Sequence, residues 1–313
     1  MNKIKQLFPF LSLWIFCSSW GFYAHKKINE TAVFLLPTEM ATFYKDNIRI
    51  ITERATDADK RCYVDTAEGP RHYIDLDRFE EDIDSIPIHW SKAKEKYTER
   101  QLLMTGVVPW QIWRTYQNLV RAFVQQDVDK IIRYSADLGH YVADAHVPLH
   151  TTSNYNGQFT NQVGIHAFWE TRLPEMFSSE YNLFIGPAMY IREPLETAWA
   201  IVKESNARVD SVLHIEKHLS KNFKDSEQKT YITRNNQLVL TYSDNYATAY
   251  HHALNGMVER RFRASILHVA SYWYSAWIDA GQPIWNFGPS VLHNEDEDII
   301  YNGKKTLGRE EWH

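Results

Sequence analysis

Two His/carboxylate pairs lie near the middle of the 313-residue chain, each with a spacing of four residues. His140 and Asp144 form the first pair, and His166 and Glu170 form the second. On an α-helix, residues four apart lie on one face a turn apart, so both members of a pair can bind the same ion. His150 lies between the pairs, after a proline that we expect to end the first helix and turn the chain toward a neighbouring position.

The side chains in these pairs favour zinc, which binds imidazole nitrogen and carboxylate oxygen in tetrahedral or five-coordinate sites. A single pair of this spacing is usually a surface pair without a metal. Two pairs around a third histidine reverse that expectation, and we predict a metal site. His146 lies on a different face of the same helix and is expected to support the site or the structure. His268 is expected to be a surface or hydrogen-bonded core histidine.

The composition limits the classes of function. Hydrophobic residues make up 44% of the chain and charged residues 23%, which excludes disorder as the main state. The formal net charge of −5 gives no strong positive field that would attract nucleic acid or an anionic membrane. A site that binds phosphate would therefore need a local source of positive charge, such as a bound metal ion.

Residues 1–19 have the organisation of a signal peptide. Two lysines precede an apolar run over residues 7–16, and small residues follow at 17–19. The run is too short for a permanent membrane anchor. We expect cleavage after Ser19 and export to a periplasm or out of the cell. Phe16 argues against lipidation of Cys17, and the basic start argues against the alternative of a short buried helix.

Cleavage at this point would make Trp20 the first residue and would leave Cys62 as the one remaining cysteine. An intramolecular disulfide is then excluded, although an exported protein could form one. A zinc site built from several thiolates is excluded as well. Any metal site must depend mainly on His, Asp and Glu side chains.

Helical periodicity extends over most of the chain, whereas strand signals are scarce. The predicted fold is all-α, with a single multi-helix domain over residues 20–283 and a polar tail over 284–313. The helical segments are an early one around Ile28 to Leu36, then Trp110 to Val124, Val128 to Ala145, His166 to Leu173, Leu195 to Leu219 and Ala247 to Ala280. The last of these has an apolar stripe that we expect in the core: Met257, Phe262, Ile266, Val269, Trp273 and Trp277.

The site residues resemble the superfamily of bacterial zinc-dependent phospholipases C and fungal zinc-dependent single-strand nucleases. The shared pattern is an N-terminal Trp, an early His, an Asp followed by a His, then His-x3-Asp-x5-His and a later His-x3-Asp/Glu. All of these positions are filled in order between residues 20 and 170. They are Trp20, His25, Asp57, His72, His140, Asp144, His150, His166 and Glu170.

The resemblance implies a cleft that holds three zinc ions. In the family's arrangement the first ion takes Asp57, His72, His140 and Asp144. The second takes His25, a bridging Asp144, and the free amine and carbonyl of Trp20, which the removal of the signal peptide would expose. A free α-amine loses its proton to a metal more readily than a lysine does. The third ion takes His150, His166 and Glu170.

Two aspartates compete for one ligand position. Asp57 and Asp59 share a side if their segment is extended, and they point apart if it is helical. Asp57 is preferred because it matches the first Asp of the Asp-x-Asp-Lys form found in some phospholipases C. By the same resemblance Asp57 would also orient the attacking water or act as a base. Asp75 would orient an imidazole or a water from behind the ligands.

The reaction implied by the resemblance is phosphodiester hydrolysis by a zinc-bound hydroxide. Glu170 in the last ligand position and the lack of a disulfide favour an exported phospholipase C, with phospholipid as substrate and transient contact with a membrane surface. The alternative is a single-strand nuclease acting on nucleic acid, because the short stretch from Trp20 to His25 is similar to the nuclease form. In either case Tyr155 or Phe159, in the loop 154–162, could contact the substrate or belong to an ordinary connector. A less favoured alternative is a zinc-binding protein without turnover. No stable protein partner is implied.

Overall fold

The computed structural model describes residues 21–79, 82–234 and 236–284, and within these ranges the fold is all-α apart from one hairpin. The helices of the first half are α1 (Gly21–Val33), α2 (Thr38–Asp46), α3 (Ile48–Arg54), α4 (Asp57–Arg61), α5 (Trp90–Lys96), α6 (Glu99–Thr105), α7 (Val108–Gln125) and α8 (Val128–Ala145). Those of the second half are α9 (Ile165–Ala167), α10 (Leu173–Phe177), α11 (Pro194–Asn206), α12 (Val209–Ser220), α13 (Asp225–Gln228), α14 (Asp244–Ala253) and α15 (Met257–Asp279).

Short turns connect several of these helices. The 3₁₀ turns are η1 (Gly69–Arg71), η2 (Leu76–Arg78), η3 (Ile83–Ser85), η4 (Pro148–Thr151) and η6 (Ser178–Glu180). A π-helical turn, η5 (Phe168–Arg172), continues directly from α9 into α10. Two of these turns, η4 and η5, carry candidate site residues.

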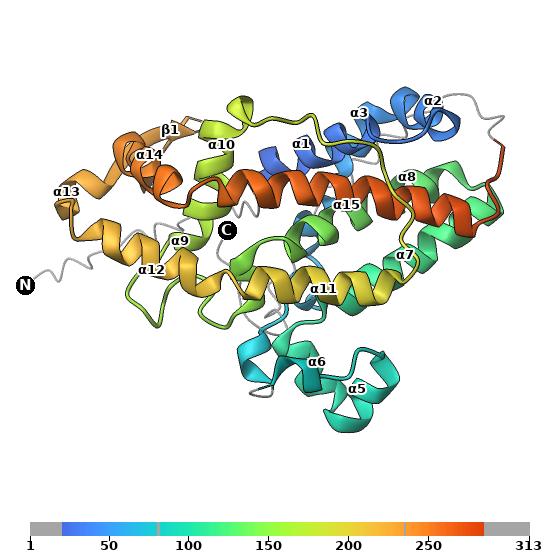
Figure 1. The fold of residues 1–313 in the computed structure, drawn as a ribbon, viewed down its shortest axis with the longest axis horizontal. Coiled ribbons are helices and arrows are strands. Elements are labelled where there is room, and N and C mark those ends of the chain that lie inside the picture. The colour runs from blue at the N-terminus through green and yellow to red at the C-terminus, as the bar shows by residue number, and fades with distance from the viewer. Residues whose placement is uncertain (1–20, 80–81, 235, 285–313) are drawn as a thin grey trace, which may run out of the picture.

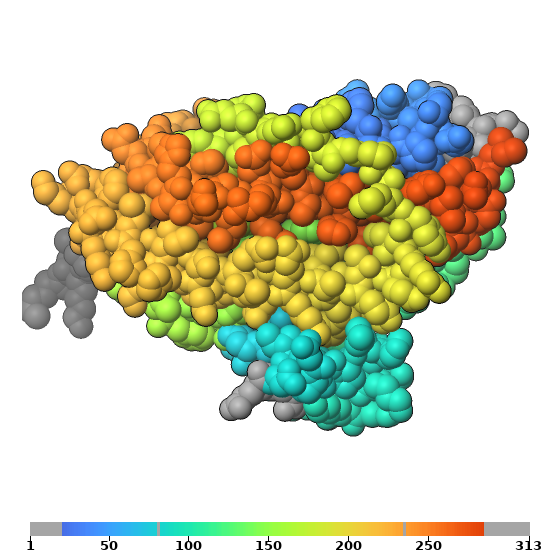
Figure 2. All heavy atoms as spheres, in the orientation of Figure 1, coloured from blue at the N-terminus to red at the C-terminus, as the bar shows by residue number. Residues whose placement is uncertain are grey.

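Four long helices form the body of the molecule. α11 and α15 run along its longest axis and both pack on α7 and α8 (Figure 1). The segment that carries α5 and α6 projects from one side of this body (Figure 2). The stripe predicted for α15 is buried from Met257 to Trp277, and the indole N–H of Trp273 donates to Ser135 O of α8 at 2.9 Å. α8, which carries His140 and Asp144, is therefore packed against α7, α11 and α15.

The ends of α7 and α8 follow from local sequence. Pro109 lies in the first turn of α7, where a missing N–H costs nothing. Gln126 adopts a left-handed conformation with φ 53°, which ends α7. The Asp127 side chain then accepts a hydrogen bond from the Lys130 N–H at 3.1 Å and caps α8. The observed α8 has the boundaries that the periodicity predicts.

A close contact between α1 and α8 depends on a glycine. A β-carbon at Gly139 would lie 2.1 Å from Asn29 Oδ1, so only glycine permits this approach of the two helices. The Asn29 side chain also donates to Ala136 O at 3.3 Å. As a result His25 of α1 lies against His140 of α8, with ring centroids 3.9 Å apart and planes 15° apart.

Two predicted helices are each divided in the structure. The segment 195–219 ends as α11 at Asn206 and begins again as α12 at Val209. The segment 247–280 is interrupted at Asn255 and Gly256, whose φ values of 47° and 73° are left-handed. Apolar spacing alone does not reveal these breaks, because the core-facing stripe continues across a short bend.

One hairpin departs from the all-helical prediction. β1 (Lys229–Arg234) pairs antiparallel with β2 (Gln237–Tyr242), in a register that places Tyr231 opposite Leu240. None of the helices within the described ranges is both long enough and apolar enough to span a bilayer. The expected signal peptide, Trp20 and the polar tail beyond Ile284 lie outside the described residues, and the predictions made for them remain predictions.

Candidate metal centre

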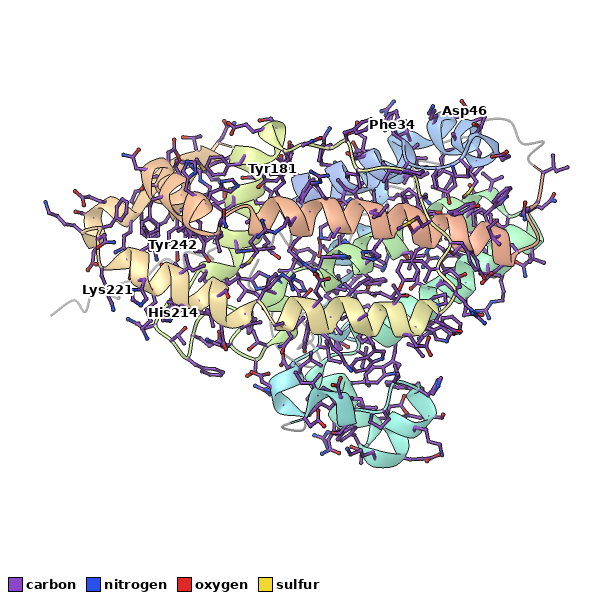
Figure 3. The ribbon with its side chains drawn as sticks, in the orientation of Figure 1. Phe34, Asp46, Tyr181, His214, Lys221 and Tyr242 are labelled. Carbon is purple, nitrogen blue, oxygen red and sulfur yellow. The ribbon has the colours of Figure 1, made fainter. Side chains whose placement is uncertain are left out.

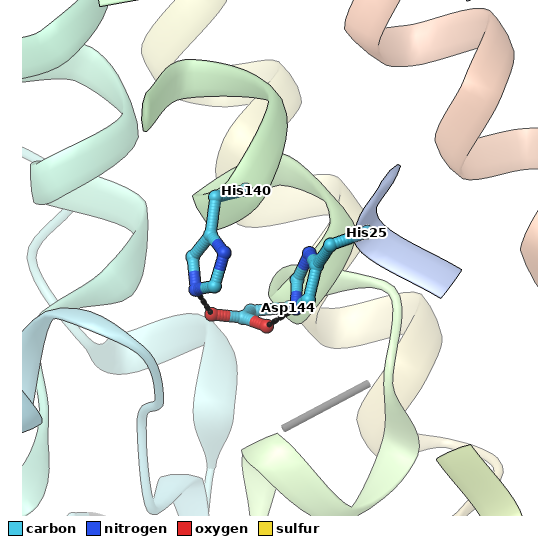
Figure 4. A group of neighbouring side chains, drawn as sticks. All are labelled: His25, His140 and Asp144. Atoms are coloured by element: carbon cyan, nitrogen blue, oxygen red, sulfur yellow. Dashed lines mark ion pairs between the residues drawn. The ribbon is translucent and has the colours of Figure 1, made fainter. Parts of the chain in front are cut away.

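Asp144 lies between two imidazoles that come from different helices. Its Oδ1 is 3.3 Å from His25 Nε2 of α1, and its Oδ2 is 3.2 Å from His140 Nε2 on the same helix (Figure 4). All three side chains are buried. Each oxygen of this carboxylate therefore faces a different histidine, which is the arrangement of a bridging ligand.

His72 joins the same cluster from the segment that follows η1. Its Nδ1 lies 2.9 Å from Asp144 Oδ2 and 3.0 Å from His140 Nε2. Asp59 approaches from α4, with Oδ1 3.4 Å from His140 Nε2 and 3.8 Å from His72 Nδ1. The structure thus brings His25, His72, His140 and Asp144 together, as the sequence predicts, and adds Asp59.

The preference for Asp57 over Asp59 is wrong. α4 is helical, and side chains two residues apart on a helix point in nearly opposite directions. Asp59 is 5% exposed and faces α8, whereas Asp57 points outward and its Oδ1 lies 3.1 Å from Lys60 Nζ. Asp57 is in none of the ligand groups found among the described residues, so it is not placed to bind an ion in this cluster.

A further group, called the third group below, lies beside this cluster, which itself contains two overlapping groups of candidate ligands. His150 Nε2 is 3.1 Å from His166 Nε2 and 3.2 Å from Glu170 Oε2, and His166 Nε2 is 3.0 Å from the same oxygen. His150 is on η4, two residues after Pro148. Its Nδ1 donates to His72 O at 2.7 Å, and its carbonyl accepts from the Ile74 N–H at 2.9 Å. These contacts connect the third group to the segment that carries His72.

The second predicted pair lies across an irregular helix. His166 is in α9 and Glu170 is in the π-helical turn η5, which has a wider backbone than an α-helix. Pro174 follows at the start of α10 and has no N–H to donate to the carbonyl four residues earlier, that of Glu170. The spacing of four still places both side chains together, but the turn type was not predicted.

Hydrogen bonds fix which nitrogen of two histidines faces inward. Ala55 O accepts from His140 Nδ1 at 2.8 Å, and His72 O accepts from His150 Nδ1 at 2.7 Å. A carbonyl oxygen can only accept, so each Nδ1 carries the proton and each Nε2 presents a lone pair when the ring is neutral. These lone pairs face carboxylate oxygens, an arrangement that requires a positive charge between them.

The donor set therefore fits metal ions. Three groups of buried side chains within the described ranges could each hold an ion: His25, His140 and Asp144; Asp59, His72 and His140; and His150, His166 and Glu170. The mixture of imidazole and carboxylate is the chemistry of zinc and related transition metals. The second ring nitrogens of His140 and His150 bond to backbone carbonyls, as metal-ligating histidines commonly do.

The charges in this cluster support one another. Burial lowers the pKa of His140, but the carboxylates of Asp144 and Asp59 outweigh it and raise the pKa to about 10. Burial raises the pKa of Asp144, and the histidines around it, His140 first, hold that pKa well below its usual value. The carboxylates of the cluster therefore remain ionised, and the cluster favours binding of positive charge, either as protons on the histidines or as a metal ion.

Two other predicted residues are not members of the three groups. Asp75 is buried, its Oδ2 lies 3.6 Å from Arg78 Nε, and it belongs to none of the three groups found among the described residues. His146 bonds to Val142 O at 2.7 Å through Nδ1 and to His268 at 2.9 Å through Nε2. His146 and His268 are thus a hydrogen-bonded pair that supports the structure, as expected.

Sequence reasoning missed Glu68, which lies next to the candidate ligand His72. Glu68 is fully buried, with Oε1 3.7 Å from His72 Nε2. Cys62 Sγ lies 3.5 Å from the same nitrogen. Glu68 and His72 have the spacing of four that singled out the other pairs, so this signal was present in the sequence.

The first described residue is anchored to the third group. The Gly21 N–H donates to Thr171 Oγ1 at 3.0 Å, and Thr171 directly follows Glu170. A β-carbon at position 21 would lie 2.7 Å from Thr171 Cγ2, so glycine allows this contact. α1 therefore begins beside Glu170, one of the candidate metal ligands.

Comparisons with known proteins give no identification, because the chain matches no family model and no curated protein. The functional conclusion must therefore come from the site itself.

Proposed function

We propose that this protein is an exported, zinc-dependent phosphodiester hydrolase of the phospholipase C and single-strand nuclease type. The observation that carries the proposal is the bridging position of Asp144 between His25 and His140, with a third group of ligands tied to the same backbone. Adjacent metal ions joined by a carboxylate are a recurrent solution for hydrolysing phosphate esters.

The proposed ligand sets follow the distances. Asp59, His72, His140 and Asp144 would hold one zinc ion, and His150, His166 and Glu170 would hold another. Asp144 and His25 would hold the third together with the amine and carbonyl of Trp20. In support of this role for Trp20, the next residue, Gly21, is bonded to Thr171 beside Glu170. Cleavage after Ser19 would place a free amine one residue from that anchor.

When bound, zinc polarises phosphoryl oxygens and lowers the pKa of a water molecule toward neutrality. The chain itself supplies position and proton transfer. Asp144 sets the separation of the paired sites, because each of its oxygens faces a different imidazole. Asp59 is a buried carboxylate whose Oδ1 lies 3.4 Å from His140 Nε2, beside the position proposed for an ion and its water. We assign to Asp59 the role of orienting the water and accepting its proton.

Phospholipid is the proposed substrate class. The acidic last ligand is Glu170, the form that resembles phospholipases C, and Phe159 in the adjacent loop exposes 67% of its surface. A nuclease is the second candidate, because the ring of Tyr155 lies 5.9 Å from that of His166 at an angle of 76°. An aromatic ring beside the metal ligands could stack on a nucleobase.

The deciding experiment assays one zinc-loaded preparation of residues 20–313 on phosphatidylcholine, single-stranded DNA and bis(p-nitrophenyl) phosphate. We expect hydrolysis of the phospholipid and of the nitrophenyl ester, with both activities lost on chelation and in Asp59→Asn. Strong DNA cleavage with inert lipid would establish the nuclease instead. A protein that binds zinc and hydrolyses none of the three would be a zinc-binding protein without turnover.

A further inference from the structure

The hairpin exposes apolar side chains on both of its faces. Tyr231 pairs with Leu240 across the strands, and Leu238 is two residues from Leu240, so the three share one face. They are exposed by 67%, 52% and 74%, respectively. On the other face Val239 is exposed by 38%. A hairpin of a soluble protein normally packs one face on the core, and exposed apolar strands in water favour association with something else.

The base of the hairpin is fixed to the helical segment that carries His166 and Glu170 of the third ligand group. Tyr242 is buried and its ring stacks on Phe168, with centroids 3.8 Å apart and planes 10° apart. The Ser243 N–H donates to Gln228 O at 2.9 Å and closes the base. Phe168 lies between His166 and Glu170 in the chain. The exposed part of the hairpin is thus held at a defined position relative to the candidate metal centre.

The segment around the hairpin is basic, although the whole chain is acidic. Residues 217–242 contain four lysines and one arginine against one aspartate and one glutamate, which gives a formal charge of +3 in a chain of −5. Lys221 and Tyr242 lie at the same end of the molecule (Figure 3). The net charge of the whole chain does not reveal this basic region, because most of the acidic residues lie elsewhere in the sequence.

Apolar side chains next to lysines are the composition of elements that bind the surface of an anionic bilayer. The apolar groups enter the boundary between head groups and acyl chains, and the lysines remain with the phosphates. A second copy of the chain is a poorer occupant, because a basic surface gains nothing against its own basic counterpart. Charge therefore selects the lipid surface.

We propose that the β1–β2 hairpin docks the protein on anionic phospholipid surfaces, with Tyr231, Leu238 and Leu240 entering the lipid. The role of docking in catalysis rests on the proposed function, whereas docking itself does not. The hairpin would hold the protein at the membrane surface that contains its proposed phospholipid substrate.

The test uses co-sedimentation with vesicles of phosphatidylcholine containing phosphatidylglycerol. The variant is Leu238→Ser/Leu240→Ser, in which both exposed leucines become polar. The matched control is Phe34→Ser, which removes an apolar side chain that is 63% exposed and well apart from Tyr242 and Lys221 along the longest axis (Figure 3). We expect the double variant to bind at least about tenfold more weakly and the control to bind like the wild type. Binding should weaken in high salt and without phosphatidylglycerol.

The readouts separate failure of this proposal from failure of the proposed function. Hydrolysis of soluble bis(p-nitrophenyl) phosphate reports on the metal centre alone and should be equal in the wild type and the double variant. No hydrolysis by the zinc-loaded wild type would refute the proposed function and leave the vesicle result standing. Equal vesicle binding by wild type and double variant would overturn docking by the hairpin. Absence of vesicle binding, with self-association that the double variant loses, would assign the hairpin to a second copy instead.

Discussion

The carboxylate of Glu68 lies behind the imidazole of His72, with Oε1 3.7 Å from Nε2, while Nδ1 of that ring faces Asp144. Glu68 is held there by ion pairs to Arg61 and Arg71, and Tyr141 donates a hydrogen bond to it. For Nδ1 to bind a metal, the proton of a neutral His72 must be on Nε2. A fixed negative charge beside Nε2 favours that tautomer.

Glu68→Gln should therefore weaken zinc binding by about 10–100-fold at the paired sites, because the shape is kept and the charge is lost. Competition with a chromophoric chelator measures this change. Asp137→Asn is the control, since Asp137 also pairs with Arg61 (3.0 Å) and has no contact with His72 among the described side chains. Unchanged zinc affinity in Glu68→Gln would exclude the orienting role.

The two aspartates of α4 give a second matched pair. Asp59→Asn should lower activity by at least about a hundredfold and reduce zinc content, because it removes a carboxylate 3.4 Å from His140 Nε2. Asp57→Asn removes only a surface pair with Lys60 and should change the free energy of unfolding by less than about 1 kcal/mol. Metal analysis and hydrolysis rates measured side by side distinguish them. The reverse order would restore Asp57 as the ligand.

Two histidines of one segment should behave differently. His140→Ala should abolish hydrolysis, because His140 Nε2 faces Asp59, His72 and Asp144. His146→Ala should retain most of the activity and lower the free energy of unfolding by about 1–3 kcal/mol, since it leaves a cavity and removes the hydrogen bond to the half-buried His268. Thermal unfolding and kinetics of the two variants provide the check. Loss of activity in a stably folded His146→Ala would contradict the assignment.

The metal-free protein should release protons when it binds zinc. Burial lowers the pKa of His72, but Cys62 and Asp144 outweigh it and hold that pKa well above its usual value, and the pKa of His140 is about 10. His140 Nε2 lies 3.0 Å from His72 Nδ1, so one of these two nitrogens must accept a hydrogen bond from the other. At least one of the two rings is therefore protonated near pH 7.5, and about one proton should leave per protein. Titration calorimetry in buffers of different ionisation enthalpy measures this number. Heats that do not depend on the buffer would refute it.

The same shifts predict the pH dependence of stability without metal. A raised pKa in the folded state stabilises the protein fully below the unfolded value of 6.5, and the stabilisation is lost as the pH rises through about 10. The melting temperature of the metal-free protein should fall over that range. The zinc-loaded protein should show a smaller fall, because the metal takes the place of the protons. Parallel curves for the two forms would contradict this prediction.

The amino terminus can be tested directly. A preparation that begins at Trp20 should bind one zinc ion more than one in which extra residues precede Trp20, because the extension removes the free amine. Hydrolysis should fall with the lost ion. An extended protein with full zinc content and full activity would refute the role of Trp20.

Local spacing in the sequence determined much of the site. His140 and Asp144 share a helix face because four residues make about one turn, and this holds wherever the helix packs. His166 and Glu170 remain together even though their turn is π-helical, since the change in backbone width is small over one turn. The apolar stripe of α15 follows from the same periodicity. Such features depend on residues that are near in the chain.

The tertiary structure decided what depends on distant residues. Asp59 instead of Asp57 faces the cluster because of how α4 packs on α8, and the sequence of α4 alone offers both sides equally. The contact between Gly139 and Asn29 brings His25 to His140, and the fold places Glu68 between two arginines behind His72. The sequence did not predict the hairpin, because its two strands are short and their pattern differs little from that of a loop. Only the folded structure shows which of their side chains the core leaves exposed. The spacing of residues along the chain determines which side chains share a face of a helix. Which face turns toward the site is decided only when helices that are distant in the sequence pack against one another.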